Sequence, residues 1–131
     1  MDSLGRLRAI AASLPEAYEE QAWVGHRWRI RTRTFAHLLD VEDGKPEAYA
    51  RAAGVRDGTV LTLRASADEV AAFKAMGPPY FFGGWGRDAV GIRIDDTTDW
   101  AEIAELVAES YRLLAPQRLS RALGPAAPPA R

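Results

Sequence analysis

The sequence predicts an α+β domain with an antiparallel sheet and helices packed on one face of that sheet. First, segments with helical apolar spacing are separated by segments with a period of two, and the main elements follow the order helix, hairpin, strand, helix, hairpin, helix. Second, the strands are short and joined by tight polar or glycine-rich turns. Third, 131 residues, 47% hydrophobic and 27% charged, suit one globular domain.

The first elements are a helix and a hairpin. The helix covers residues 2–13, with Asp2 or Ser3 as its N-cap, and it ends before Pro15. The hairpin pairs strands 27–30 and 35–39. Its first strand alternates Trp28 and Ile30 with arginines, and the turn is the polar stretch 31–33.

The middle of the chain predicts a helix, a strand and a second helix. Residues 46–53 begin with proline and are closed by glycine, as in a short helix. Residues 59–63 are rich in β-branched side chains. Ser66 and Glu69 have the spacing of a capping box, so a helix runs from there to Met76.

A second hairpin and the longest helix complete the domain. Strands 80–82 and 88–94 flank a glycine-rich connection. Asp99 opens the last helix and Pro116 ends it. Its predicted buried stripe is Trp100, Ile103, Val107, Tyr111 and Leu114, and its predicted wet face is Glu102, Glu105, Glu109 and Arg112. We expect a single domain over 1–123 and a flexible Pro/Ala-rich tail over 124–131.

Composition excludes several classes of protein. The chain has no cysteine, which removes disulfide scaffolds, thiolate nucleophiles and cysteine zinc sites. No apolar run reaches the roughly 20 residues of a membrane helix, and Asp2 and Arg6 interrupt any signal-peptide pattern. We therefore expect a cytoplasmic protein that does not bind membranes.

The net charge of −1 conceals segments of opposite sign. Residues 21–39 carry four arginines and no acid, whereas residues 95–109 carry six acids and no base. If Trp28 and the apolar residues of strand 88–94 face the helices, the arginines between them face away. An open, basic sheet face is the expected result.

Two features suggest nucleic-acid binding. Arginines on an exposed strand can hold phosphates, although they can equally be solubilising residues. The glycine-rich hairpin can present an aromatic ring as a wing that stacks on bases, or its aromatic residues can belong to the core. The candidate nucleic-acid-binding residues are Arg27, Arg29, Arg31, Arg33, Trp85, Arg87 and Arg93.

Other polar residues give weaker signals. Trp23, His26 and His37 are candidates to line a pocket in a cupped sheet. With Glu19, Glu20 or Asp40 the histidines could form a metal or acid–base site, but their spacing matches no ligand motif. No serine has a nucleophile-elbow context. We expect no catalytic residues, no bound metal and no cofactor.

Several motifs, in order, resemble the MmcQ/YjbR family. They are Leu-Pro-Glu at 14–16, Phe-Ala-His-Leu at 35–38, Pro-Tyr-Phe-Phe at 79–82, Asp-Trp at 99–100 and Glu-Ser-Tyr-Arg-Leu-Leu-Ala-Pro-Gln-Arg-Leu at 109–119. The insertion Tyr-Ala-Arg-Ala-Ala-Gly at 49–54 is similar to an actinobacterial-type branch. One departure is the first hairpin turn, where the family usually has a glycine followed by lysine and this chain has Arg31, Thr32 and Arg33.

The resemblance implies a curved antiparallel sheet in a double-wing arrangement similar to the CyaY/frataxin shape, and a DNA-binding protein without an established catalytic set. Our first hypothesis is DNA binding, mainly through phosphates, by the basic sheet face and hairpin wings. One alternative is a protein-interaction or regulatory module, using the open sheet face and the acidic last helix. Another is a small-molecule-binding domain with a pocket in the cupped sheet. The sequence leaves the oligomeric state open.

Overall fold

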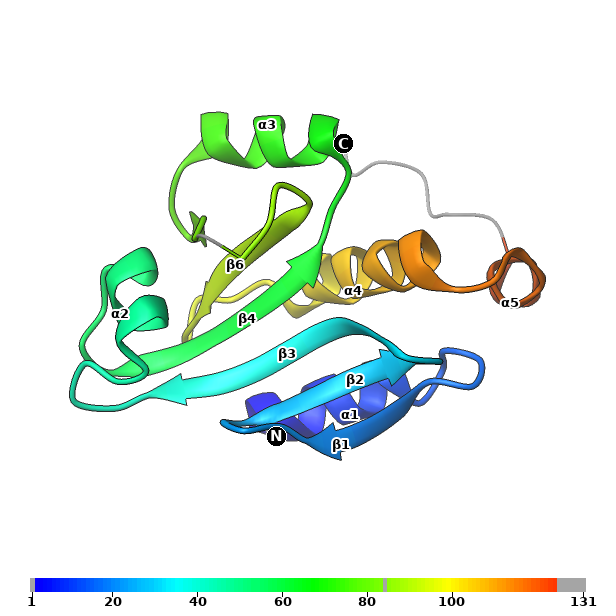
Figure 1. The fold of residues 1–131 in the computed structure, drawn as a ribbon, viewed down its shortest axis with the longest axis horizontal. Helices are drawn as coiled ribbons and strands as arrows, with labels where there is room; N and C mark the ends of the chain where they lie inside the picture. The colour runs from blue at the N-terminus through cyan, green and yellow to red at the C-terminus, as the bar shows by residue number, and fades with distance from the viewer. Residues whose placement is uncertain (1, 84, 125–131) are drawn as a thin grey trace.

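The structure, a computed structural model, describes residues 2–83 and 85–124, which form five helices and one six-stranded antiparallel sheet (Figure 1). The strands lie in the order β1-β2-β3-β4-β6-β5. None of the described helices combines the length and apolarity needed to cross a membrane. The elements are α1 (Ser3–Ala11), β1 (Tyr18–Gln21), β2 (His26–Ile30), β3 (Arg33–Val41), α2 (Glu47–Ala53), β4 (Gly58–Arg64), α3 (Ala67–Met76), β5 (Tyr80–Phe81), β6 (Ala89–Ile94), α4 (Trp100–Leu114) and α5 (Gln117–Leu123).

The main core lies between the sheet and helices α1 and α4, which Figure 1 shows behind the strands. Trp28, Ile30 and Ile92 point into this core together with Val107 and Tyr111 of α4. Residues of a strand alternate between the two faces of a sheet. The alternation in β2 and β6 therefore sends their arginines to the opposite face, as the sequence pattern predicts.

The opposite face carries a second, smaller core beneath α2. Ala50 and Ala53 of α2 pack on Leu39, Val60 and Phe81, and Figure 1 shows this helix at one end of β3 and β4. The predicted α+β fold with an antiparallel sheet is confirmed. The expectation that all helices pack on one face is wrong in this detail, because α2 covers one end of the other face.

Helix ends follow the capping residues that the sequence indicates. The carboxylate of Asp2 accepts a hydrogen bond from the Gly5 amide (2.7 Å) at the start of α1. Ser66 and Glu69 form both hydrogen bonds of the capping box that opens α3. Asp99 caps α4 by accepting from two backbone amides of its first turn. These contacts satisfy amides that lack intrahelical partners.

Two short elements, β1 and α5, were not predicted from the sequence. Strand β1 is polar on both faces because it lies at the sheet edge and forms ion pairs, so it shows no apolar period. Helix α5 has seven residues and buries only Leu119, too few for a periodic signal. The predicted tail also included Gly124, which is described; residues 125–131 lie outside the described residues.

The exposure of α4 departs from the predicted stripe. Trp100 and Leu114, predicted to be buried, are only partly buried, although both pack against the main core. Ser110, which was not predicted to be buried, is completely buried and bridges two strands: its hydroxyl donates to the Phe35 carbonyl (2.6 Å) and accepts from the Arg64 amide (2.8 Å). Glu102, predicted to face water, accepts a hydrogen bond from the Tyr80 hydroxyl. The pKa of Tyr80 is raised, mainly by burial and also by this hydrogen bond. Both contacts attach the helix to the sheet.

The first hairpin turn has an unusual backbone. Arg31 adopts a φ of 56°, in the left-handed region that side chains with a Cβ disfavour. The Tyr18 hydroxyl donates to its carbonyl (2.6 Å), and its guanidinium pairs with Glu16 (2.9 Å). These contacts hold a turn that needs no glycine here.

Candidate functional site

Three arginines gather on the part of the sheet that α2 leaves uncovered. Arg27 and Arg29 of β2 lie opposite His37 and Thr34 of β3, and Arg64 ends β4 on the same face. All three side chains are partly exposed. We call this surface the arginine face and define it by six residues from three neighbouring strands: Arg27, Arg29, Thr34, His37, Thr62 and Arg64.

Carboxylates partly neutralise the arginine face. Glu20 of β1 contacts both Arg27 and Arg29, and Asp88 pairs with Arg64 at 2.9 Å. Three guanidinium groups therefore face two carboxylates. Because side-chain exposure is 34% for Glu20 and 57% for Asp88, both remain accessible to solvent, and such pairs add little to stability.

The other candidate arginines have different surroundings. Arg31 pairs with Glu16 at the hairpin turn. Arg33 and Arg87 are exposed, and within the described ranges neither has an acidic partner. Arg93 donates to the Ala53 carbonyl (3.4 Å) at the end of α2. Arg93 therefore shares a sheet face with Arg27 and Arg29 but lies at the covered end, so the predicted set does not form one continuous open patch.

Trp85 does not project as the tip of a wing. Its half-buried ring lies against Gly83 in the loop between β5 and β6, so closely that a Cβ at Gly83 would be 2.0 Å from the ring. The ring stacks on Tyr49 of α2, with centroids 5.0 Å apart, and Phe81 meets it edge-on at 6.2 Å. The alternative reading, in which these aromatic residues belong partly to a core, describes the geometry better.

A cleft of about 160 Å³ lies between this aromatic cluster and the arginine face. His37 meets Tyr49 edge-on at 6.0 Å on one side of the cleft. Gly91 makes the packing of Phe81 possible, since a Cβ there would lie 2.3 Å from the Phe81 ring. The lining residues are Thr34, Phe35, Ala36, His37, Tyr49, Thr62, Leu63, Arg64, Trp85 and Ala89.

His37 is held by a backbone contact. Its Nε2 lies 2.7 Å from the Val24 carbonyl oxygen, which can only accept, so Nε2 carries the proton. Burial lowers the pKa of His37, and the Val24 carbonyl opposes this shift in part. The ring is therefore neutral near pH 7 and fastens the β1–β2 turn to the sheet.

The remaining pocket candidates lie elsewhere. His26 pairs through Nδ1 with Glu19 (3.0 Å), on the core face. Arg8 also binds Glu19 through two hydrogen bonds, which lower the pKa of that carboxyl. Trp23 is 94% exposed. The structure thus does not bring Trp23, His26 and His37 into one pocket.

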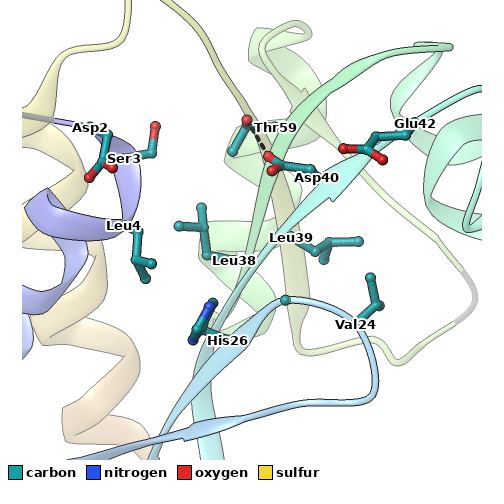
Figure 2. A pocket seen from close by; sticks show the side chains of 11 residues that line it. Asp2, Ser3, Leu4, Val24, His26, Leu38, Leu39, Asp40, Glu42 and Thr59 are labelled. Atoms are coloured by element: carbon teal, nitrogen blue, oxygen red, sulfur yellow. Dashed lines mark hydrogen bonds between the residues drawn. The ribbon is translucent and has the colours of Figure 1, made fainter.

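His26 borders a larger cavity of about 500 Å³ beside the N-terminus of α1 (Figure 2). Asp2, Asp40 and Glu42 contribute carboxylates to its lining, and Thr59 donates to Asp40 (2.7 Å). None of its described lining residues is a lysine or an arginine. Across the described part of the chain, no three His, Asp or Glu side chains come together as metal ligands. The acidic lining disfavours an anionic ligand here.

The lining residues of the cleft that sequence reasoning missed include Tyr49, Thr62 and Arg64. Two of them had a signal. In β4 the apolar Leu61 and Leu63 belong to the main core, so Thr62 and Arg64 fall on the arginine face by alternation alone. Tyr49 had none, because its position depends on how α2 packs against the sheet.

The fold defines a small α+β protein with an open antiparallel sheet. It is similar to a crystal structure from Pseudomonas syringae, with a TM-score of 0.66, 14% identity, and coverage of 86% of this chain and 98% of that one. It is also similar to the Deinococcus radiodurans protein DR2400, a DUF419 domain, with a TM-score of 0.66, 16% identity, and coverage of 98% and 93%. At these identities the likeness shows the fold alone.

The family is shown by the sequence model of YjbR, which matches residues 12–113. The chain belongs to the YjbR family. No curated protein matches the chain. The resemblance noted in the sequence is thereby confirmed at the level of the family.

Proposed function

We propose that this protein binds DNA through the arginine face, with Arg27, Arg29 and Arg64 contacting phosphates. Arg31, Arg33 and Arg87 supply further positive charge at the margins. Guanidinium groups pair well with phosphate oxygens and retain their charge at any physiological pH. The absence of cysteine suits the reducing cytoplasm, which is the compartment we propose.

The proposal rests chiefly on one observation: three partly exposed arginines lie on one sheet face with carboxylates that solvent can reach. Glu20 orients Arg27 and Arg29 side by side. A phosphate that replaces a solvated carboxylate meets donors already in place, so less side-chain entropy is lost on binding. Arg33 and Arg87 have no such competitor among the described residues.

Salt dependence tests this proposal. Each phosphate contact contributes roughly 0.7–0.9 to the slope of log affinity against log salt. Removing two contacts in Arg27→Ala/Arg29→Ala should flatten the slope by about 1.4–1.8, measured by fluorescence anisotropy with a labelled oligonucleotide. The control Arg118→Ala/Arg121→Ala removes the same charge from α5, on the core side of the sheet, and should leave the slope close to that of the wild type. Equal slopes for all three proteins would refute the proposal.

Glu20→Gln tests the same surface in the opposite direction. It removes the carboxylate between Arg27 and Arg29 but keeps a side chain of similar size. We expect DNA affinity to rise, a result that damage to the fold cannot produce. Unchanged or weaker affinity in a folded variant would show that phosphate does not occupy this position.

A further inference from the structure

The cleft beside the arginine face is suited to one flat ring. Its volume of about 160 Å³ is below the roughly 300–1,000 Å³ of pockets for drug-sized ligands. Tyr49 and Trp85 line it as a stacked pair with an interplanar angle of 26°, and both side chains are half-buried. Rings fixed in this way lose little freedom when another ring stacks on them.

Two threonine side chains line the cleft. The hydroxyls of Thr34 and Thr62 form no hydrogen bond with other described residues. A nucleobase carries both donors and acceptors around its ring and can supply partners of this kind.

The positions of the arginines would allow a nucleic-acid strand to pass over the cleft. Arg27 and Arg29 lie on β2, directly beside the cleft residues His37 and Thr34 of β3. Arg64 lines the cleft from β4. Cations thus lie on both sides of an aromatic recess, the arrangement by which proteins bind single-stranded nucleic acid.

We infer that the bound DNA is single-stranded and that one unpaired base enters the cleft and contacts the Tyr49–Trp85 pair. This inference rests on the proposed function. In a duplex each base is stacked on both sides and offers only its edges in the grooves. Its ring face cannot reach this recess. The arginines then hold the phosphates that flank the inserted base.

The test compares a fluorescein-labelled 12-nucleotide single strand of mixed sequence with the same sequence in a duplex. We expect the single strand to bind at least about tenfold more tightly. Trp85→Leu should weaken single-strand binding by about 5- to 150-fold, the loss of one stacked base. Trp23→Leu, a tryptophan change outside the cleft lining, should leave it unchanged.

A second variant protects the test against misfolding. Thr62→Leu fills the cleft with apolar atoms and keeps both aromatic rings, so it should also weaken single-strand binding while circular dichroism shows the native spectrum. Equal affinity for both forms of DNA, or full affinity in Trp85→Leu and Thr62→Leu, overturns this inference and leaves the proposed function standing. If neither single-stranded nor duplex DNA binds, both this inference and the proposed function are overturned.

Discussion

At the scale of the residue, the chemistry of the arginine face is a competition between anions. Arg27 and Arg29 share Glu20, and Arg64 has Asp88. These ion pairs are partly exposed and carry little stability, so a phosphate can replace a carboxylate at small cost. The arrangement orients the guanidinium groups and also limits the net charge of the surface.

The burial of His37 leads us to expect that the stability of the protein depends on pH. Burial lowers its pKa from the ordinary value of 6.5, so the native state binds the proton less readily than the unfolded state. Its stabilising contribution is full above about pH 6.5 and decreases as the pH falls from there toward the lowered pKa. Melting temperatures at about pH 7.5 and 5.5 should differ more in the wild type than in His37→Gln. An unaltered difference in His37→Gln would contradict the prediction.

The close packing of Gly91 against Phe81 leads us to expect that substitutions at these two positions affect each other. An added Cβ would lie 2.3 Å from the Phe81 ring, so Gly91→Ala should lower the free energy of unfolding by about 1–3 kcal/mol in urea titrations. Phe81→Leu removes the obstructing ring. The double variant should therefore lose less stability than the sum of the single losses, and strict additivity would show that the two residues do not interfere.

At the scale of the element, Ser110 connects α4 to the sheet. Its hydroxyl bonds the Phe35 carbonyl of β3 and the Arg64 amide of β4. Ser110→Ala leaves both backbone groups buried and unpaired, so we expect a loss of about 1–3 kcal/mol in the free energy of unfolding. Ser13→Ala removes an exposed hydroxyl that donates to the Ile10 carbonyl, and it should change the free energy of unfolding by no more than about 0.5 kcal/mol. Equal effects of the two changes would contradict this account.

Elements with a strong local signal could be predicted from the sequence. The capping box of α3, the alternation in β2 and β6, and the periodicity of α4 depend on neighbouring residues only. β1 and α5 could not, because tertiary packing and ion pairs hold them. The site divides in the same way: alternation places Arg27 and Arg29, whereas the inward fold of Trp85 and the covering of Arg93 depend on where α2 packs.

At the scale of the whole molecule, the charged side chains and the helices that cover the sheet are distributed unevenly over its two faces. One face is closed by α1 and α4, and α2 closes one end of the other. The uncovered remainder carries arginines and the aromatic cleft, whereas the acidic cavity lies beside the start of α1. A net charge near zero thus coexists with a local cationic surface, which is what a polyanion meets.

The central claim is that the arginine face is the surface that contacts DNA, and backbone amide NMR shifts test it most directly. During titration of ¹⁵N-labelled protein with the single-stranded 12-mer, we predict the largest shifts in β2, in β3 near Thr34 and His37, and in β4 near Thr62 and Arg64, together with the Trp85 indole. Shifts concentrated on α1, on α4 or around the acidic cavity, or no shifts at excess oligonucleotide, would contradict it.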